Sequence, residues 1–323
     1  MHRRAFVGSF VGGLAAAPGF SLAQRPAIPT FGILLAFSSD AGRTFTKPLR
    51  AYLEALGYVE GRNILFDVRY AGGDVRRLPA LAAELVVQRP DVIATFGDAA
   101  ALAAKSATSD IPIVAMSEDL VRAKIVSSMS RPGRNITGLS ILGTELDAKR
   151  LELLAEVLPA RSAVLLLADT TTHRESRQAL DAAARVLGVT LHEAVVGSPD
   201  EIEQALRGAS RKGIVGVNVL SSAFLFAQRA RIIGVAGEAG LATISQWPET
   251  AEEGGLMAYG PSLLAAFRHV ATLVAKVLQG AKPADLPVEQ PTRFTLYVNL
   301  STAKALGIVF PQTTLLRADR VIE

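Results

Sequence analysis

The sequence predicts an α/β protein of two lobes, each built on a doubly wound parallel sheet. Apolar runs of strand length alternate with longer segments of helical periodicity, which is typical of repeated βα units. A length of 323 residues exceeds what one hydrophobic core usually serves. Hydrophobic residues make up 50% of the chain and aromatic residues 6%, a balance that favours Ala-, Leu- and Val-rich helices packed on sheets.

The clearest βα unit is Asp91-Val-Ile-Ala-Thr-Phe-Gly-Asp-Ala-Ala100. Its apolar run fits a strand covered on both faces. Gly97 permits a sharp turn, and Asp98 is placed to cap the helix that follows. In open α/β sheets, ligands bind beyond the carboxyl ends of the strands, where helix N–H groups favour an anionic group. Asp98 could instead occupy those N–H groups itself or hold an ammonium group.

The rest of the first half reads as further units of this kind. Large apolar residues repeat at helical spacing after the first strand, and Gly57 ends that helix. Pro79 stands in the first turn of another helix, where proline is tolerated. We expect strands at 31–37, 63–70, 91–96, 111–116 and 135–140, and helices near 45–56, 78–87 and 98–108.

A second set of units begins near residue 141. Thr144 is expected to cap its first helix, and Ser198-Pro-Asp-Glu201 has the cap, the proline and the returning glutamate of a helix start. A long helix opens at Pro261, and a proline-rich connector spans 283–291. We expect strands at 163–168, 189–196, 214–220, 241–245, 255–259 and 294–300, with short helix and turn after them.

The first 23 residues resemble an export signal. A basic His2-Arg3-Arg4 segment precedes an apolar stretch of small residues, and Ser21-Leu-Ala23 resembles a cleavage site that would leave Gln24 first. The arginine pair also fits a twin-arginine signal, so both export routes stay open. We expect cleavage near Ala23 and a periplasmic mature protein. The alternative is a buried N-terminal helix.

Composition and motifs argue against several functions. The chain has no cysteine, which removes disulfides, thiolate zinc sites and cysteine nucleophiles. Its four histidines lack metal-ligand spacing, and the common phosphate-binding, dinucleotide-binding and nucleophile-elbow motifs are missing. The net charge is +4, without a basic run of the kind that marks a nucleic-acid binder. We therefore expect no metal, no cofactor, no catalysis and no nucleic-acid partner.

Polar side chains follow the strands of both halves, at the points where the strands end. If the two sheets face one another, these exits line one cleft that suits a small polar ligand. Phe96 and Trp247 could sandwich an apolar or aromatic group there. Glu118 and Asp119 could serve acid–base chemistry, although such pairs more often cap a helix or hold a cationic group. The candidate ligand-binding residues are Ser38, Ser39, Phe96, Gly97, Asp98, Ala99, Ser117, Glu118, Asp119, Asp169, Thr170, Thr171, Ser221, Ser222, Gln246, Trp247 and Tyr259.

Several short segments match one family pattern. The longest is Leu53-Glu-Ala-Leu-Gly-Tyr-Val-Glu-Gly-Arg-Asn63, of the form L-x-x-L-G-Y-x-E-G-x-N. The others are Leu78-Pro-Ala-Leu-Ala-Ala-Glu-Leu85, Ile111-Pro-Ile-Val114, Arg131-Pro-Gly-Arg-Asn-Ile-Thr-Gly138, Lys149-Arg-Leu-Glu-Leu-Leu154, Tyr259-Gly-Pro261, Ala281-Lys-Pro-Ala-Asp-Leu-Pro-Val-Glu-Gln-Pro291, Asn299-Leu300 and Ala303-Lys-Ala-Leu-Gly307. Across residues 30–323 the chain resembles an ABC transporter substrate-binding family that includes tryptophan- and tyrosine-binding members.

The resemblance implies a type I periplasmic-binding fold, in which crossover strands join two α/β lobes that close on a ligand. It also implies delivery of the ligand to an inner-membrane ABC permease, and we expect the protein to be a monomer. Two departures from the family pattern weaken the case for an unmodified amino acid. The usual T-x-A-A after the third strand is Gly97-Asp-Ala-Ala100 here, and the usual Asp-Pro after the fourth strand is Asp119-Leu120.

We assign residues 28–139 and 261–290 to lobe 1 and residues 140–260 and 291–323 to lobe 2, although the sequence alone leaves the place of the last segment open. The leading hypothesis is a periplasmic solute-binding component of an ABC importer, which binds an amino acid or a related carboxylate, or another small polar or aromatic solute. Two alternatives stay open. One is a sugar-sensing transcription regulator, which would need an N-terminal helix-turn-helix, and the other is a two-domain α/β enzyme acting on a small polar substrate.

Overall fold

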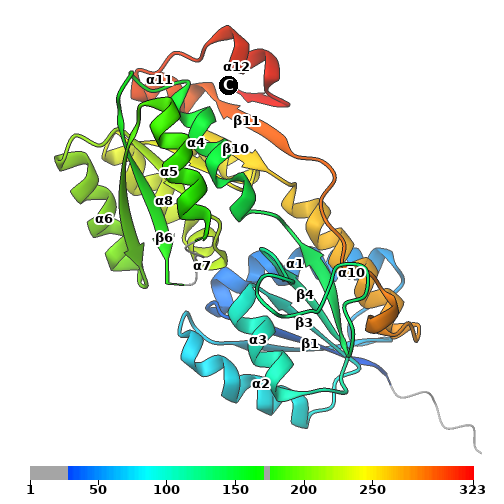
Figure 1. Ribbon diagram of the computed structural model, residues 1–323. Coiled ribbons are helices and arrows are strands. Elements are labelled where there is room, and N and C mark those ends of the chain that lie inside the picture. Colours follow the sequence, from blue (N-terminus) through cyan, green and yellow to red (C-terminus); the bar gives the residue numbers. More distant parts are fainter. Residues whose placement is uncertain (1–27, 171–174) are drawn as a thin grey trace, which may run out of the picture.

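The computed structural model describes residues 28–170 and 175–323. The export signal expected at residues 1–23 and the candidate residue Thr171 lie outside this part. The described chain forms two α/β lobes, which confirms the predicted fold class (Figure 1). Within these residues, no helix combines the length and the apolar character needed to span a bilayer.

Lobe 1 is built on a five-stranded parallel sheet of order β2-β1-β3-β4-β5. Its strands are β1 (Thr30–Leu35), β2 (Leu65–Tyr70), β3 (Val92–Phe96), β4 (Ile113–Ser117) and β5 (Ile136–Ser140). Its helices are α1 (Ser39–Ala55), α2 (Leu78–Val87), α3 (Asp98–Ala107) and α10 (Leu263–Leu278), with a 3₁₀ turn at Val75–Arg77. Alternate strand residues face opposite ways, so one face packs on α1 and α10 and the other on α2 and α3.

Lobe 2 is built on a seven-stranded sheet of order β12-β11-β10-β9-β8-β6-β7. Its strands are β6 (Ala163–Asp169), β7 (Thr190–Val196), β8 (Gly216–Val219), β9 (Ala242–Ser245), β10 (Met257–Gly260), β11 (Thr295–Asn299) and β12 (Arg320–Ile322). Its helices are α4 (Asp147–Ala155), α5 (Glu175–Leu187), α6 (Pro199–Arg211), α7 (Ala223–Ala227), α8 (Arg229–Glu238), α9 (Glu249–Glu252), α11 (Leu300–Leu306) and α12 (Gln312–Arg317), with a 3₁₀ turn at Thr144–Leu146. A further 3₁₀ turn at Pro283–Asp285 follows α10 on the lobe 1 side. The lobe 2 core lies on both faces of this sheet.

The chain crosses between the two sheets in three places, at 141–146, 261–262 and 290–294. Figure 1 shows α10, in gold, lying with the blue and cyan elements of lobe 1, while β11 returns to lobe 2. The returning segment also pairs with lobe 1, because Glu289 forms a bridge with Leu139 at the end of β5. On these contacts we propose that 261–290 belong with lobe 1 and 291–323 with lobe 2.

The lobe 2 sheet departs from the expected parallel arrangement at one edge. Strand β11 runs antiparallel to β10, with Thr295 opposite Gly260. The chain leaves lobe 2 at Gly260 and re-enters at Thr295, so it starts β11 at the end of the sheet where β10 finished. The C-terminal strand β12, which the sequence analysis missed, is only three residues long and mostly exposed.

Of three helix starts predicted from the sequence, one is confirmed by the structure and two are wrong. Ser198 caps α6 as expected, since its Oγ accepts from Glu201 N, and Glu201 in turn accepts from Gly197 N at 2.7 Å. Thr144 caps no helix, because its Oγ1 faces Arg122 and α4 begins only at Asp147. Asp98 is the first residue of α3 and not its cap, a position that Gly97 takes without a side chain.

Candidate functional site

The strand ends of the two sheets meet where the lobes face each other. A Cβ on Gly97, at the end of β3 in lobe 1, would lie 3.2 Å from the Cβ of Ala223 at the start of α7 in lobe 2. The ring of Phe45 on α1 lies 5.9 Å from the ring of Phe226 on α7. These contacts bring the lobes together, so the cleft between them is closed.

A cavity of about 100 Å³ lies in this closed cleft. Lobe 1 contributes the turn from β3 into α3, and lobe 2 contributes the end of β6 and the start of α7. The lining residues are Ala36, Phe37, Gly73, Val75, Phe96, Gly97, Asp98, Ala99, Ala100, Asp169, Thr170, Val196, Gly197, Ala223 and Phe224. A larger hollow of about 490 Å³ at the mouth shares several of these residues and adds Ser38, Arg76 and Ser198. The two spaces together form a cleft with apolar walls and a few polar groups, as in many small-molecule sites.

Each lobe presents a serine–aspartate pair at this cavity. In lobe 1, Ser117 at the end of β4 donates to Asp98 Oδ1. In lobe 2, Ser222 donates to Asp169 Oδ2 at 2.5 Å. The serine hydroxyls orient both carboxylates, and both aspartates line the cavity from opposite sides. A carboxylate accepts hydrogen bonds and does not donate them, so both aspartates suit a donor group such as an ammonium.

The turn at Gly97 shapes the start of α3. Gly97 has φ 85° and ψ 158°, a backbone region that side chains essentially exclude. No side chain caps the helix, which leaves its first turn to the cavity that Gly97, Asp98 and Ala99 line. The N-terminus of a helix carries partial positive charge and attracts an anionic group. The first turn of α3 therefore suits an anionic group, and the two aspartates suit a cationic one.

Glu118, beside this cavity, belongs to a direct contact between the lobes. Its carboxylate hydrogen-bonds Ser221 at the end of β8, and Ser221 donates to Gln246 Oε1 at the end of β9. The residue as a whole is partly exposed, but Oε2 is buried and has no hydrogen-bond partner in the described chain. Burial raises the pKa of Glu118 to about 8, and the negative charges of Asp98 and Asp147 add to the rise.

A buried ion pair supports the lobe 2 side of this contact. Arg150 on α4 is fully buried and donates to Asp147 Oδ1 at 2.5 Å, to the carbonyl of Gly143 at 2.5 Å and to the carbonyl of Tyr259 at 3.1 Å. Burial raises the pKa of Asp147, and the nearby Arg150 opposes that rise. The guanidinium thus joins the first interlobe crossing, at Gly143, to the strand that leads into the second crossing.

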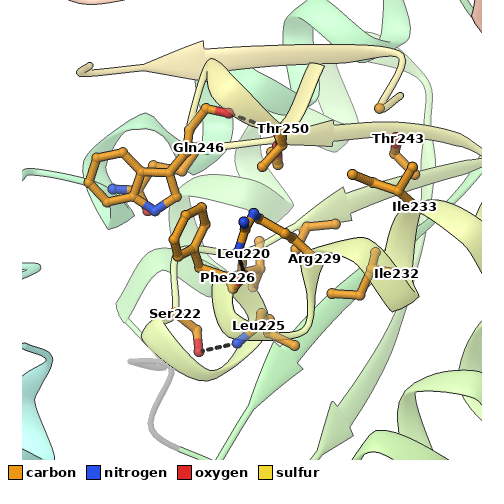
Figure 2. A pocket seen from close by; sticks show the side chains of 14 residues that line it. Leu220, Ser222, Leu225, Phe226, Arg229, Ile232, Ile233, Thr243, Gln246 and Thr250 are labelled. Atoms are coloured by element: carbon orange, nitrogen blue, oxygen red, sulfur yellow. Dashed lines mark hydrogen bonds between the residues drawn. The ribbon is translucent and has the colours of Figure 1, made fainter. Parts of the chain in front are cut away.

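A second, smaller cavity of about 30 Å³ lies inside lobe 2 (Figure 2). Figure 2 shows Phe226 and Arg229 beside each other on its wall; the guanidinium carbon lies 4.5 Å from the ring centroid. Trp247 lines this cavity and packs on Phe226 at 5.8 Å. Phe96 lines the cleft cavity, and Phe45 and Phe226 connect it to Trp247. In this closed arrangement Phe96 and Trp247 line different cavities, and the sandwich of a ligand between them stays a prediction.

The candidate residues fall into distinct places. Those that line the cleft cavity are Phe96, Gly97, Asp98, Ala99, Asp169 and Thr170. Ser38 lines the mouth, Ser117 and Ser222 hold the aspartates, and Glu118, Ser221 and Gln246 form the lobe contact. Contact between these residues and a solute stays a prediction.

Four further candidates lie neither in the lining of the cleft cavity or its mouth nor in the polar contacts just named. Ser39 is exposed at the start of α1. Asp119 accepts from the backbone N–H groups of Val121 and Arg122 at 2.9 Å, and so holds its own turn. The Tyr259 carbonyl accepts from Arg150 while its ring packs near Phe294, and Trp247 packs on Phe226 in the cluster that also holds the lobe 1 core. These four residues lie at or after strand ends, as the candidates in the cavity do. Where the structure shows their contacts, those contacts belong to local turns and packing and not to the cavity.

The apolar walls of the cavity were not predicted from the sequence. Phe37, Val75 and Phe224 line it together with Gly73 and Gly197. Phe37 continues the apolar run of the first strand and looks like an ordinary core residue. The two glycines follow strands β2 and β7. A glycine after a strand was the one sequence feature that could have indicated these positions as part of the cavity.

The fold and this cleft define a class: a two-lobe solute-binding protein of the type I periplasmic-binding kind. The chain belongs to the family described as "ABC transporter substrate binding protein", whose model matches residues 31–322. This match confirms the family predicted from the short segments. It makes the chain the substrate-binding component of an ABC transport system, with a small-molecule solute and a permease as partners. The family is not an enzyme family, and its members act outside the cytoplasm.

Named relatives agree with this assignment. A tyrosine-binding protein of Clostridioides difficile (strain R20291) is 28% identical over 260 residues, which cover 79% of this chain and 74% of that protein. The structure of a conserved domain protein from Vibrio cholerae O1 biovar El Tor has a TM-score of 0.82 at 26% identity, covering 91% of this chain and 99% of that one. An ABC domain from Streptococcus pneumoniae in complex with L-Trp has a TM-score of 0.80 at 23% identity, with the same coverage.

Proposed function

We propose that this protein binds an amino acid or a related small carboxylate with an apolar or aromatic group in the closed cleft, and passes it to an ABC permease. The observation that carries the proposal is the cavity between the lobes, which Asp98 lines from lobe 1 and Asp169 from lobe 2. Two relatives support the solute class, because one is a tyrosine-binding protein and another holds L-Trp.

Different groups of the cavity would bind the carboxylate, the ammonium group and the apolar side chain of the solute. The first turn of α3 would receive the carboxylate of the solute. Asp98 and Asp169 would accept from its ammonium group, since charge-assisted hydrogen bonds are the strong ones in a closed site. Phe37, Phe96 and Phe224 would cover the apolar side chain. Because these groups come from both lobes, the solute would stabilise the closed arrangement over the open one.

The proposal includes the setting in which the protein works. The chain would be exported through its first 23 residues and cleaved near Ala23. The mature protein would be a periplasmic monomer that needs no cofactor, binds no nucleic acid and carries out no catalysis. Hinge closure would trap the solute, and the closed form would dock on the permease.

A thermal-shift screen tests the solute class. The purified chain is heated with single amino acids, small aromatic carboxylates and the matching amines. A solute that binds only the folded protein stabilises it by about 2.7 kcal/mol at a hundredfold excess over its Kd. We expect a shift with at least one amino acid or aromatic carboxylate, and no turnover of that compound. No shift with any member of these classes, or consumption of the compound, would contradict the proposal.

A further inference from the structure

Glu118 crosses from lobe 1 into a polar contact that belongs to lobe 2. It follows β4, whereas Ser221 and Gln246 follow β8 and β9. Its Oε2 atom lies against Gly143, because a Cβ at that glycine would overlap Oε2, Ser221 Oγ and the Gln246 amide. Glu118 Oε2, Ser221 Oγ and the Gln246 amide therefore all pack against Gly143. This carboxyl group is therefore buried by the closure of the lobes, not by the fold of lobe 1.

The hydrogen atoms in this contact can be counted. Ser221 has one hydroxyl hydrogen, and it donates this hydrogen to Gln246 Oε1. A carbonyl oxygen cannot donate, so the Ser221 oxygen is left to act as an acceptor toward Glu118. An ionised carboxylate has no hydrogen to give, whereas a carboxylic acid has one. With the Ser221 hydrogen on Gln246, the bond between Glu118 and Ser221 forms only when Glu118 is protonated and donates.

The charges around Glu118 favour the same form. Asp98 at the start of α3 and Asp147 at the start of α4 both face it with negative charge, and Arg150 faces it with positive charge. Arg150 is committed to Asp147 and to two carbonyl groups. A second carboxylate held near Asp98 in a buried site costs free energy that a neutral acid avoids. No described cation bonds to Glu118 to offset this cost.

We propose that Glu118 is a proton-binding group that couples closure of the cleft to pH: the lobes close with Glu118 neutral and open when it ionises. This inference rests on the proposed function, because it concerns how the solute cleft closes. At a pH where Glu118 is ionised in the open state, closure on a solute would take up one proton from the solvent.

The direction of the effect follows from the two states. In the closed arrangement, burial raises the pKa of Glu118 from 4.5 to about 8, while in the open arrangement water would return it to an ordinary value of about 4.3. Between these values the closed state holds the additional proton. Closure therefore becomes less favourable as pH rises through this window, by up to about tenfold per pH unit. Below and above the window the dependence vanishes.

Spin labels on the two lobes can measure this directly. The chain has no cysteine, so Arg43→Cys on α1 with Asp200→Cys on α6 gives one label on each side of the cleft mouth. Both positions are exposed. Double electron–electron resonance then gives the distances between the two labels, and from them the closed and open populations of the solute-free chain near pH 5.5 and pH 8. In the parent, we expect the closed-to-open ratio to fall at least tenfold between these pH values.

Two variants distinguish an effect of Glu118 protonation on the closed-to-open ratio from an effect of side-chain packing. Glu118→Gln keeps the shape and an N–H donor for Ser221, so the variant should keep one ratio at both pH values. Glu54→Gln, an exposed carboxylate on α1, should follow the parent. A parent ratio that does not change with pH overturns the proposal, as does a Glu118→Gln variant that still changes. The first result would fit a turned Gln246 amide that donates to Ser221, with Glu118 ionised, and the second would assign the pH response to another group. The measurement uses no solute, so it can fail while the thermal-shift screen succeeds, and the reverse.

Discussion

Replacing Arg150 by methionine should destabilise the fold more than any surface change. The Arg150 side chain is fully buried and makes bonds to Asp147, Gly143 and Tyr259. Methionine fills similar space but donates nothing, so the buried Asp147 carboxylate, whose Oδ2 already lacks a hydrogen-bond partner in the described chain, would stand unpaired. Removing one partner of a buried pair typically costs ~3–5 kcal/mol in unfolding free energy. We expect Arg150→Met to lose an amount in this range near neutral pH.

The loss should depend on pH with a definite sign. Burial raises the pKa of Asp147 in the folded chain and Arg150 lowers it, so the variant should raise it further. An acid whose pKa is higher folded than unfolded makes folding less favourable as pH rises above the unfolded value. The difference between parent and variant should therefore be larger near pH 8 than near pH 5. Adding Asp147→Asn to Arg150→Met removes the unpaired charge and should recover part of the loss.

Urea unfolding followed by circular dichroism measures these differences through the midpoint and slope. Arg207→Met is the matched control, since Arg207 is a partly exposed arginine that pairs with Glu203 and Glu238 at 2.9 and 2.8 Å. Its unfolding midpoint should stay close to that of the parent, because exposed ion pairs contribute little. A loss below about 1 kcal/mol in Arg150→Met, or one that shrinks with rising pH, would refute the reasoning.

Two further predictions concern Trp247 and the mature N-terminus. Trp247→Ala should cost ~3–5 kcal/mol in urea unfolding, because the side chain is 6% exposed and packs on Phe226; a stable variant would place Trp247 in a mobile wall and not in the core. Intact-mass measurement of periplasmic protein should give a chain that starts at Gln24, and a cytoplasmic chain that keeps Met1 would contradict export.

The sequence predicted the lobes well because strand and helix periodicity are local. The fold class, the strand at 92–96 and the cap at Ser198 follow from nearest neighbours in the chain. The antiparallel β11 could not be predicted this way, because its direction depends on where the chain re-enters lobe 2. Thr144 shows the same limit, since Arg122, far away in sequence, takes its hydroxyl.

The cleft was partly predictable for a related reason. Asp98 and Asp169 follow buried strands, and strand ends of parallel sheets meet at one edge. The roles of neighbouring residues depend on the opposite lobe, which no local pattern describes. Glu118 looked like one more polar strand exit, yet Ser221 and Gly143 bury it. Trp247 looked like a ligand wall, yet Phe226 fills the space beside it.

Titration calorimetry on two variants from opposite lobes tests the central claim most directly. The solute with the largest shift in the thermal screen is titrated into the parent, Asp98→Ala and Asp169→Ala. If the closed cleft grips the solute from both sides, each variant loses a charged hydrogen bond worth ~1.5–3 kcal/mol, about ten- to a hundredfold in affinity. Both variants should bind the solute more weakly than the parent while both stay folded. If both bind like the parent, the solute does not lie between Asp98 and Asp169, and the cleft assigned here is not the binding site.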